Sequence, residues 1–351
     1  MRSEDLLISI GGIDLSYIVE ASSGQKIKNR RAAIRRWTAF AACVLLVAGM
    51  LLALPKLLKN HDTDSLIATD EAQFTVADGK LLSYNGADKI VVIPETITMI
   101  RAAAFARNAS VETVVIPASV EEIEDGAFAG AVNLREITVN ENSGWFLSED
   151  GVLFKPSRHR LHTYPASSDA ESYSIPEGIE VIASKAFAYS KLKSITFPES
   201  LLDIDLSAFM ECDNLTRVDL PADIRTISFL SFDGCDSLRE INVAEGNEKY
   251  CSVDGVVYSA DKKRLVLYPC GKTEETFTVP DGVEVIELYA FSGCKNLKKV
   301  ILPDSLTEIQ YGAFMNSGLT TLNIPESVTN IDEMAFEGTA VVYDATNEII
   351  P

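Results

Sequence analysis

Apolar residues recur at fixed distances along most of this chain. Eight prolines are each followed, eleven residues later, by a phenylalanine. The pairs are Pro94/Phe105, Pro117/Phe128, Pro176/Phe187, Pro198/Phe209, Pro221/Phe232, Pro280/Phe291, Pro303/Phe314 and Pro325/Phe336. An isoleucine stands six residues after each of these prolines, and a small residue precedes each phenylalanine. A spacing kept through so many copies predicts a solenoid, in which every repeat forms one coil and packs against its neighbours.

Each repeat also contains a short stretch in which apolar and polar residues alternate. After the phenylalanine and a polar turn the chain reads roughly L-x-x-I-x-I-P, as it does from Leu134 and from Leu238. Alternation with β-branched residues indicates a strand. The closing proline ends the strand because it lacks an amide hydrogen. We therefore expect eight coils of 22–23 residues, stacked as parallel strands around one continuous core of isoleucine and phenylalanine.

Two of the steps between successive prolines are longer, at 59 residues instead of 22 or 23. The additional residues fall near 140–170 and 244–275, and residues 150–165 match residues 254–269 at an offset of 104. Both stretches predict β-hairpins inserted into the array, the second with its turn at 259–262. A shorter relative runs from Asp78 to an Asn85-Gly86 turn, and we expect it to cap the N-terminal end of the stack.

The consensus P-x-x-[IVL]-x-x-I-x-x-x-A-F-x-x-C-x-x-L-x-x-I, found over residues 74–343, resembles the BspA-like class of leucine-rich repeats. The resemblance implies a β-rich leucine-rich-repeat solenoid of short parallel strands. It also implies a microbial surface protein that binds other proteins or cells, with no catalytic residue in the repeats. The chain departs from the consensus at its cysteine, which is kept only as Cys212, Cys235 and Cys294.

The segment before the repeats contains 18 consecutive uncharged residues, from Trp37 to Leu54. As a helix it would be about 27 Å long, close to the hydrocarbon thickness of a bilayer. Basic residues in 26–36 precede it, and by the positive-inside rule they place the N-terminus in the cytoplasm. The alternatives are a buried helix and a cleaved signal peptide, which usually has a much shorter leading segment.

We therefore predict a single-pass protein of the cell membrane with its repeats outside the cell. The expected parts are a cytoplasmic leader at 1–25, a basic juxtamembrane segment at 26–36, a transmembrane signal-anchor helix at 37–58, a linker at 59–73 and a repeat ectodomain at 74–351. The leader is either a solvated segment that helps insertion or a docking element for a cytoplasmic partner, since segments this short fold mainly on binding.

The charge distribution excludes one class of partner. Residues 1–59 carry a net charge of +5, and the rest of the chain carries −25, which together make the total of −20. A strongly acidic ectodomain argues against nucleic acid as a ligand. The chain also lacks the P-loop, nucleophile-elbow, H-E-x-x-H and dinucleotide-binding motifs. We therefore predict a non-enzyme that needs no cofactor or metal ion.

The cysteines of the repeats fall into two groups. Cys212, Cys235 and Cys294 each follow a phenylalanine by three residues, so we expect structural thiols in a stacked column and not metal ligands. Cys251 and Cys270 flank the second predicted hairpin. The alternatives there are a disulfide and two separate thiols, because a one-residue change in strand register would send one side chain to the opposite face.

The remaining candidate for function is the outer face of the strands. The third and fifth positions of L-x-x-I-x-I should point outward and form two columns along the array. The candidate binding residues are Thr113, Glu136, Ser194, Arg217, Glu240, Lys299 and Thr321 in the first column, with Thr138, Thr196, Asp219, Asn242 and Asn323 in the second. We expect this face to recognise an extracellular protein or another cell-surface macromolecule, in adhesion. The alternative is a receptor-like protein that couples ectodomain binding to a cytoplasmic partner through residues 1–25.

Overall fold

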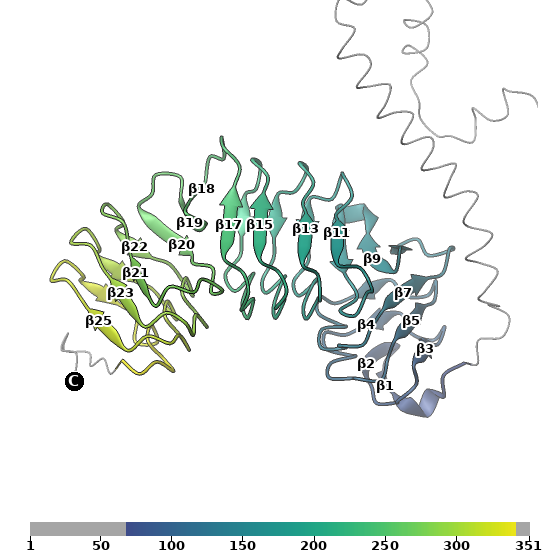
Figure 1. Cartoon of the computed structure of the whole chain (residues 1–351). Helices are drawn as coiled ribbons and strands as arrows, with labels where there is room; N and C mark the ends of the chain where they lie inside the picture. Colours follow the sequence, from purple (N-terminus) through teal and green to yellow (C-terminus); the bar gives the residue numbers. More distant parts are fainter. Residues whose placement is uncertain (1–67, 342–351) are drawn as a thin grey trace, which may run out of the picture. The chain divides into compact units, whose positions relative to one another are not determined.

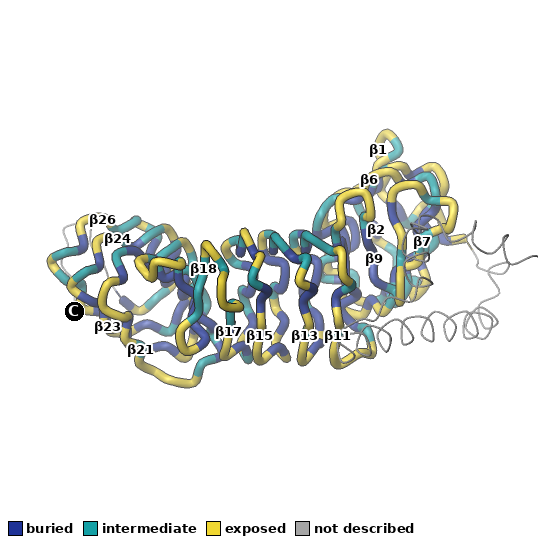
Figure 2. The backbone as a smooth tube through the Cα atoms, turned by 90° about the horizontal axis from the view of Figure 1, so that it is seen from above, coloured by how far each residue is buried: buried dark blue, intermediate teal, exposed yellow. Residues whose placement is uncertain are grey.

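The structure is a computed structural model that describes residues 68–341. These residues form a stack of short β-coils that follow one another in sequence order (Figure 1). In each coil two short strands alternate with turns, and buried positions line the inside of the coil while exposed positions face outward (Figure 2). The predicted leader, juxtamembrane segment and transmembrane helix lie outside the described residues. Within 68–341, no helix is long and apolar enough to cross a membrane.

One row of strands, here called the face strands, lies along one side of the stack. They are β3 (Ile90–Val92), β5 (Thr113–Ile116), β7 (Glu136–Val139), β11 (Ser172–Ser174), β13 (Ser194–Thr196), β15 (Arg217–Leu220), β17 (Glu240–Val243), β21 (Thr276–Thr278), β23 (Lys299–Ile301) and β25 (Thr321–Asn323). They pair in parallel, as predicted, in the groups β3-β5-β7, β11-β13, β15-β17 and β21-β23-β25.

A second row consists of two-residue strands, here called the isoleucine strands. They are β4 (Met99–Ile100), β6 (Glu122–Ile123), β12 (Val181–Ile182), β14 (Asp203–Ile204), β16 (Thr226–Ile227), β22 (Val285–Ile286), β24 (Glu308–Ile309) and β26 (Asn330–Ile331). Each ends on the isoleucine of the predicted column, and these isoleucines are paired between neighbouring coils, for example Ile182 with Ile204.

The predicted hairpins contain the remaining strands. β1 (Phe74–Ala77) and β2 (Lys80–Tyr84) form the first hairpin, after the 3-10 helix η3 (Glu71–Gln73). The two predicted hairpin insertions each form a three-stranded antiparallel meander. Their strands are β8 (Leu147–Glu149), β9 (Val152–Lys155) and β10 (Arg160–Thr163), with η4 (Pro156–Arg158), and then β18 (Tyr250–Val253), β19 (Val256–Ser259) and β20 (Arg264–Leu267).

The sequence suggested that the hairpins interrupt the array. In the structure they begin additional coils instead. The last strand of each pairs in parallel with the next isoleucine strand, and Leu81, Leu161 and Leu265 thereby extend the isoleucine column. The first hairpin occupies the N-terminal end of the stack as predicted, with β1 at the edge of its sheet. Ordered structure also extends into the predicted linker, where the Thr69 hydroxyl accepts a hydrogen bond of 2.9 Å from the Val92 amide.

The phenylalanines form a ladder of rings through the core. All eight are at most 6 % exposed. Neighbouring ring centroids lie 4.9 Å apart for Phe187 and Phe209 and 5.0 Å apart for Phe209 and Phe232. Tyrosines Tyr84, Tyr164 and Tyr268 take the place of phenylalanine in the three hairpin coils. This spacing is close to the distance between paired strands, so each ring packs on the ring of the next coil.

The core is divided into three clusters, and the prediction of one continuous core is therefore wrong. The central strand of each meander explains the division. Side chains alternate between the two faces of a strand. In β9, Leu153 joins the N-terminal cluster while Val152 and Phe154 join the middle one. In β19, Val257 and Val256 are divided between the middle and C-terminal clusters in the same way. Each central strand therefore separates two hydrophobic clusters and contributes side chains to both.

Asp-Gly turns connect the first two strands of each hairpin. Asp254 and Gly255 both have positive φ, at 50° and 76°, as a type I′ turn requires. The hairpin turn of the N-terminal unit is Asp78-Gly79, not the predicted Asn85-Gly86. A Cβ atom on Gly255 would lie 2.9 Å from the Cα of Glu240 in β17. The turn therefore packs directly against the preceding face strand, which ends the face-strand pairing at this point.

We predict that Gly255→Ala lowers the free energy of unfolding by about 2 kcal/mol or more, because left-handed strain adds to a clash with backbone atoms. Thermal unfolding of the full-length chain, followed by circular dichroism, measures the effect. Gly246→Ala is the matched control for strain alone, since Gly246 has φ of +91° and open space around it. An equal loss of stability in both variants would show that the turn is not packed against β17.

Candidate functional site

The structure places the predicted binding residues in two columns along the face strands. Thr113 is opposite Glu136, Arg217 is opposite Glu240 and Lys299 is opposite Thr321. The second column has the same register, as Asp219 and Asn242 show. Whether this face binds a partner stays a prediction. The structure adds three strands that the sequence analysis missed, β3, β11 and β21, although each ends two residues before a proline of the repeat.

The middle of the face is neutralised by its own side chains. The Arg217 guanidinium donates to the Asp219 carboxylate at 2.8–3.0 Å and to Glu240 at 3.2 Å. The Asn242 amide donates to Asp219 at 3.0 Å. The hydrogen-bonded Arg217 holds the pKa of Asp219 below its ordinary value. These exposed charges are therefore already paired with one another along the coils.

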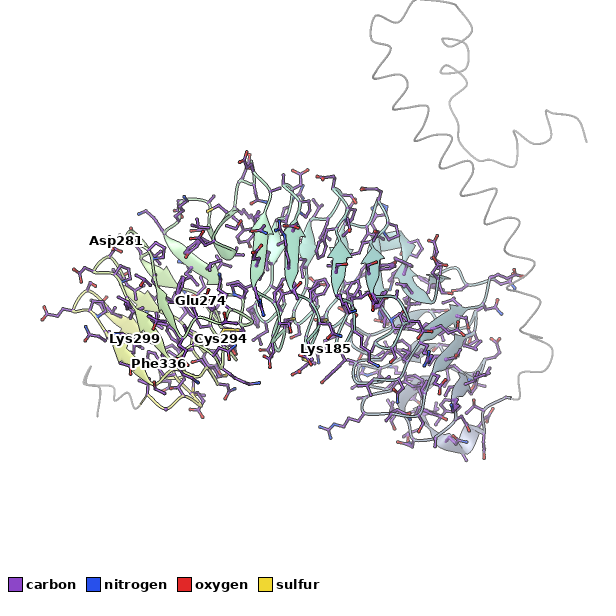
Figure 3. All side chains as sticks on the ribbon, in the orientation of Figure 1. Lys185, Glu274, Asp281, Cys294, Lys299 and Phe336 are labelled. Atoms are coloured by element: carbon purple, nitrogen blue, oxygen red, sulfur yellow. A yellow bond between two sulfur atoms is a disulfide. The ribbon has the colours of Figure 1, made fainter. Side chains whose placement is uncertain are left out.

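The C-terminal part of the face has a different character. Ile301 is 43 % exposed, although it is a large apolar residue. Thr278 and Asn323 flank it in the same column, and Lys299 and Thr321 lie in the other column. Figure 3 labels Lys299 among the side chains of this region. An exposed apolar centre with a polar surround is typical of a protein contact site.

The structure pairs the cysteines differently from the alternative considered above. Cys270 is disulfide-bonded to Cys294, with the two Cα atoms 4.4 Å apart, while Cys251 is a free thiol. The Cys251–Cys270 disulfide is therefore wrong. Its physical obstacle is β19, which lies between β18 and β20 and pairs Cys251 with Tyr258. Cys294 is likewise not the free thiol that its column position predicted (Figure 3).

Cys212 and Cys235 are buried free thiols, as expected. Their Sγ atoms donate to the carbonyl oxygens of Phe187 and Phe209 at 3.1 and 3.0 Å. A hydrogen bond with the neighbouring Cys212 thiol, together with burial, raises the pKa of Cys235. A protonated, enclosed thiol is a poor nucleophile, which is consistent with a packing role. In residues 68–341 no group of three His, Cys, Asp or Glu side chains is arranged to hold a metal ion.

The turns that follow the isoleucine strands come together at two places, one at each meander. These two places are called the first and the second junction. At the first junction Arg160, whose side chain is 16 % exposed, pairs with Asp125 of the coil before it and Asp205 of a coil after it, at 2.5 and 2.8 Å. His162 is buried beside them, and its Nε2–H donates to the Ile123 carbonyl at 3.0 Å. The first junction is therefore closed by the chain's own charged groups.

At the second junction the turns carry exposed aromatic side chains. Phe229 stacks on Tyr289 across the meander, with centroids 5.6 Å apart, and Tyr289 meets Tyr311 of the next coil at 5.5 Å. Phe229 is 48 % exposed and Tyr311 is 37 % exposed. Leu206 and Leu288, both exposed, continue this aromatic edge on neighbouring turns. The sequence analysis missed this edge because its members are far apart in the chain. The available signal was the position two residues after the isoleucine of a coil, which holds Leu206, Phe229, Leu288 and Tyr311.

A small hollow of about 20 Å³, with room for only one or two water molecules, lies beside the aromatic edge. Leu230, Asp233, Tyr268, Tyr289 and Ser292 are among the residues that line it. Glu211 and Asp236 lie near Asp233. Burial and neighbouring carboxylates raise the pKa of both Glu211 and Asp233, while Lys295 opposes the shift.

Comparison with known proteins agrees with this architecture. The sequence pattern described as the BspA type leucine rich repeat region matches residues 83–147, 162–252 and 266–346, in six copies. The chain belongs to the BspA-type leucine-rich repeat family. The two gaps between the matched ranges fall within the meanders. No curated protein is significantly similar to this leucine-rich repeat chain.

Solved structures of other leucine-rich repeat proteins are similar to it. A leucine-rich repeat protein from Eubacterium ventriosum has 30 % sequence identity and a TM-score of 0.53, with 74 % of this chain and 67 % of that chain covered. The pneumococcal vaccine antigen PcpA has 27 % identity and a TM-score of 0.49, with 78 % and 73 % covered. A leucine-rich cell surface protein from Faecalibacterium prausnitzii has 24 % identity and a TM-score of 0.49, with 79 % and 87 % covered.

We predict that peptide mapping without reduction recovers Cys270 and Cys294 in one linked pair of peptides. Cys212, Cys235 and Cys251 should react with a thiol reagent only after unfolding or, for the half-buried Cys251, slowly before it. Recovery of a Cys251–Cys270 link would contradict the strand order of the second meander.

A second prediction concerns acid stability. Burial lowers the pKa of His162, against the opposing influence of Ile123 and Asp125. The unfolded chain takes up this proton near its ordinary pKa of about 6.5, whereas the folded chain takes it up only at lower pH. Stability should therefore be complete above pH 6.5 and fall as the pH decreases below it, by at most about 1.4 kcal/mol per pH unit for one proton.

Thermal midpoints of wild type and His162→Gln at pH 7.5 and 5.5 test this. The variant should lose less stability than wild type between the two pH values, even if its midpoint is lower at both. His159→Gln is the control, because the His159 side chain is 63 % exposed. The same acid-dependent loss in His162→Gln as in wild type would contradict the assignment.

Proposed function

We propose that the chain is a non-catalytic, membrane-anchored recognition protein that binds a protein or other macromolecule at the cell surface. The strand face is the observation that carries the proposal. Face strands paired in parallel hold two columns of mostly exposed side chains on a rigid ladder. Such a surface suits binding through many weak contacts, which is the common use of solenoid repeats. Adhesion to a neighbouring or host cell is the role that this proposal assigns.

The proposed location outside the membrane is supported by chemistry within the coils. Disulfides persist in oxidising surroundings and are rare in the reducing cytosol. The Cys270–Cys294 disulfide links two successive coils of the stack. In the proposed arrangement residues 37–58 anchor the chain, residues 1–25 lie in the cytoplasm and the repeats face outward, which agrees with the asymmetry of basic residues around the apolar segment.

Ile301 marks the part of the strand face that we assign to the contact. The central charges pair with each other, as Arg217 and Asp219 do, so a partner would have to break these pairs to use them. Binding at Ile301 breaks no ion pair, and covering its exposed side chain removes apolar surface from water. The hydroxyl and amide groups around it can supply hydrogen bonds at the rim.

The test is proximity labelling on intact cells with the full-length chain fused at its C-terminus to a peroxidase. We expect biotinylation of at least one surface or matrix protein, with a several-fold loss of recovery for Ile301→Asp. Thr196→Asp is the matched control, because Thr196 is an exposed member of the same column in another sheet. Labelling confined to cytoplasmic proteins would refute the proposed orientation, and labelling no higher than that of an inactive fusion would refute recognition.

A further inference from the structure

Three separate sheets lie along the isoleucine side of the coils. The first is β1-β2-β4-β6, the second contains β8 to β16 and the third contains β18 to β26, and within residues 68–341 no ladder joins one to the next. The hydrophobic clusters divide at the same two meanders. We call the resulting parts the N-terminal block (74–139), the middle block (147–243) and the C-terminal block (250–341).

Each block begins with a hairpin of its own. The last strand of that hairpin starts the isoleucine column of the block, through Leu81, Leu161 or Leu265. A solenoid needs a terminal unit that closes the end of its core. The middle and C-terminal blocks therefore have, inside the array, the same kind of closed end that the first hairpin gives to the whole stack.

The ladder of aromatic rings is divided in the same way. One run of stacked rings ends at Phe128, the next runs from Tyr164 to Phe232, and the last begins at Tyr268. Across each junction the blocks are joined by local contacts, such as the hydrogen bond of 2.9 Å from the Ile137 amide to the Gly151 carbonyl. Parts with separate cores and sheets open as separate cooperative units.

The disulfide joins the first two coils of the C-terminal block. Cys270 follows the meander and Cys294 lies in the next coil, 24 residues further along the chain. The loop between them contains β21, in which Thr278 is paired with Ile301 of β23. Figure 3 labels Cys294 and, in β23, Lys299. The loop closed by the disulfide therefore supplies one of the two strands that hold the proposed contact strand in place.

We propose that the array extends in stages under tension and that the disulfide-bonded C-terminal block is the last stage to open. The inference rests on the proposed function, in which tension acts between the membrane anchor and a partner held at Ile301. In the N-terminal and middle blocks this tension passes along the whole backbone. In the C-terminal block it passes from Cys270 through the disulfide to Cys294, so residues 271–293 bear no load.

The contact strand β23 is consequently held between two coils that lie outside the load path. On one side it pairs with β21 of the closed loop, and on the other side with β25, which follows Ile301 in the chain. The Phe291 ring of the loop also stacks on Phe314 at 4.9 Å. Moving β23 requires its hydrogen bonds to both neighbours to break together, whereas the other blocks open one coil at a time. The contact surface therefore persists while the rest of the array lengthens.

Force spectroscopy in optical tweezers tests this inference on the full-length chain in detergent. One DNA handle is joined to the N-terminus, and the other to a clickable azido amino acid that replaces Ile301. At 3.3–3.6 Å per extended residue, the N-terminal and middle blocks should add steps of about 200 Å and about 300 Å. A third step, at higher force, should follow when the C-terminal block opens.

Reduction of the disulfide identifies the third step. Dithiothreitol should lengthen that step by about 80 Å, since 24 more residues enter the load path, and should lower its force. Cys294→Ser should give the same pattern without a reductant. Cys251→Ser is the matched control, because Cys251 is a free thiol of the same block, and it should leave all three steps unchanged. Thermal unfolding confirms that both variants are folded.

Three outcomes would overturn the inference: a single step for the whole array, a step of the C-terminal block that precedes the other two, or a third step whose force does not change on reduction. The tweezers need no partner, so their result is separate from that of the proximity labelling. If labelling fails and the staged extension is observed, recognition is wrong and the mechanical property stands. If labelling succeeds and the stages are absent, recognition stands without staged extension.

Discussion

Ring stacking from coil to coil is the constraint on which the rest of this molecule depends. The Phe209 and Phe232 rings are 5.0 Å apart and nearly parallel, which matches the separation of paired strands. A residue much larger than alanine or serine before the ring would push the coils apart, since the amide of Phe187 bonds to the Ala208 carbonyl of the next coil at 2.8 Å and the amide of Phe209 bonds to the Ser231 carbonyl at the same distance. Each truncated ring would cost about 3–5 kcal/mol through lost burial and a cavity. Little freedom therefore remains inside, and variation is confined to the surface.

The meanders keep the coils stacked but interrupt the regular pattern of the surface. Their last strands keep the isoleucine column through Leu161 and Leu265, so stacking continues. Their central strands nevertheless divide the core into separate clusters, and their Asp-Gly turns end the pairing of the face strands. Each meander thus creates a junction. The turns of the coils before and after it approach one another across the coil that the meander begins. These junctions are where the two halves of the duplication have acquired different charges.

The strand face and the aromatic edge follow from different physical causes. On the strand face, side chains alternate with the pleat, so outward positions are set by strand register and serve recognition through a broad surface. At the second junction, Phe229, Tyr289 and Tyr311 are brought together by stacking of turns and lie beside carboxylates of raised pKa. One surface is neutralised over its centre by the Arg217 network, whereas the other keeps its acidic groups largely unmatched.

The sequence by itself determined the coil, the columns of the core and the register of the strand face, because each depends on spacing within one repeat that recurs in the next. Tertiary structure alone decided which residues of different coils meet. Cys270 joins Cys294 and not Cys251 because β19 separates the strands of the meander. Phe229 reaches Tyr289 because a whole meander lies between them in the chain but only one coil lies between them in space. Contacts of this kind depend on the path of the chain through the stack, and no fixed spacing records that path.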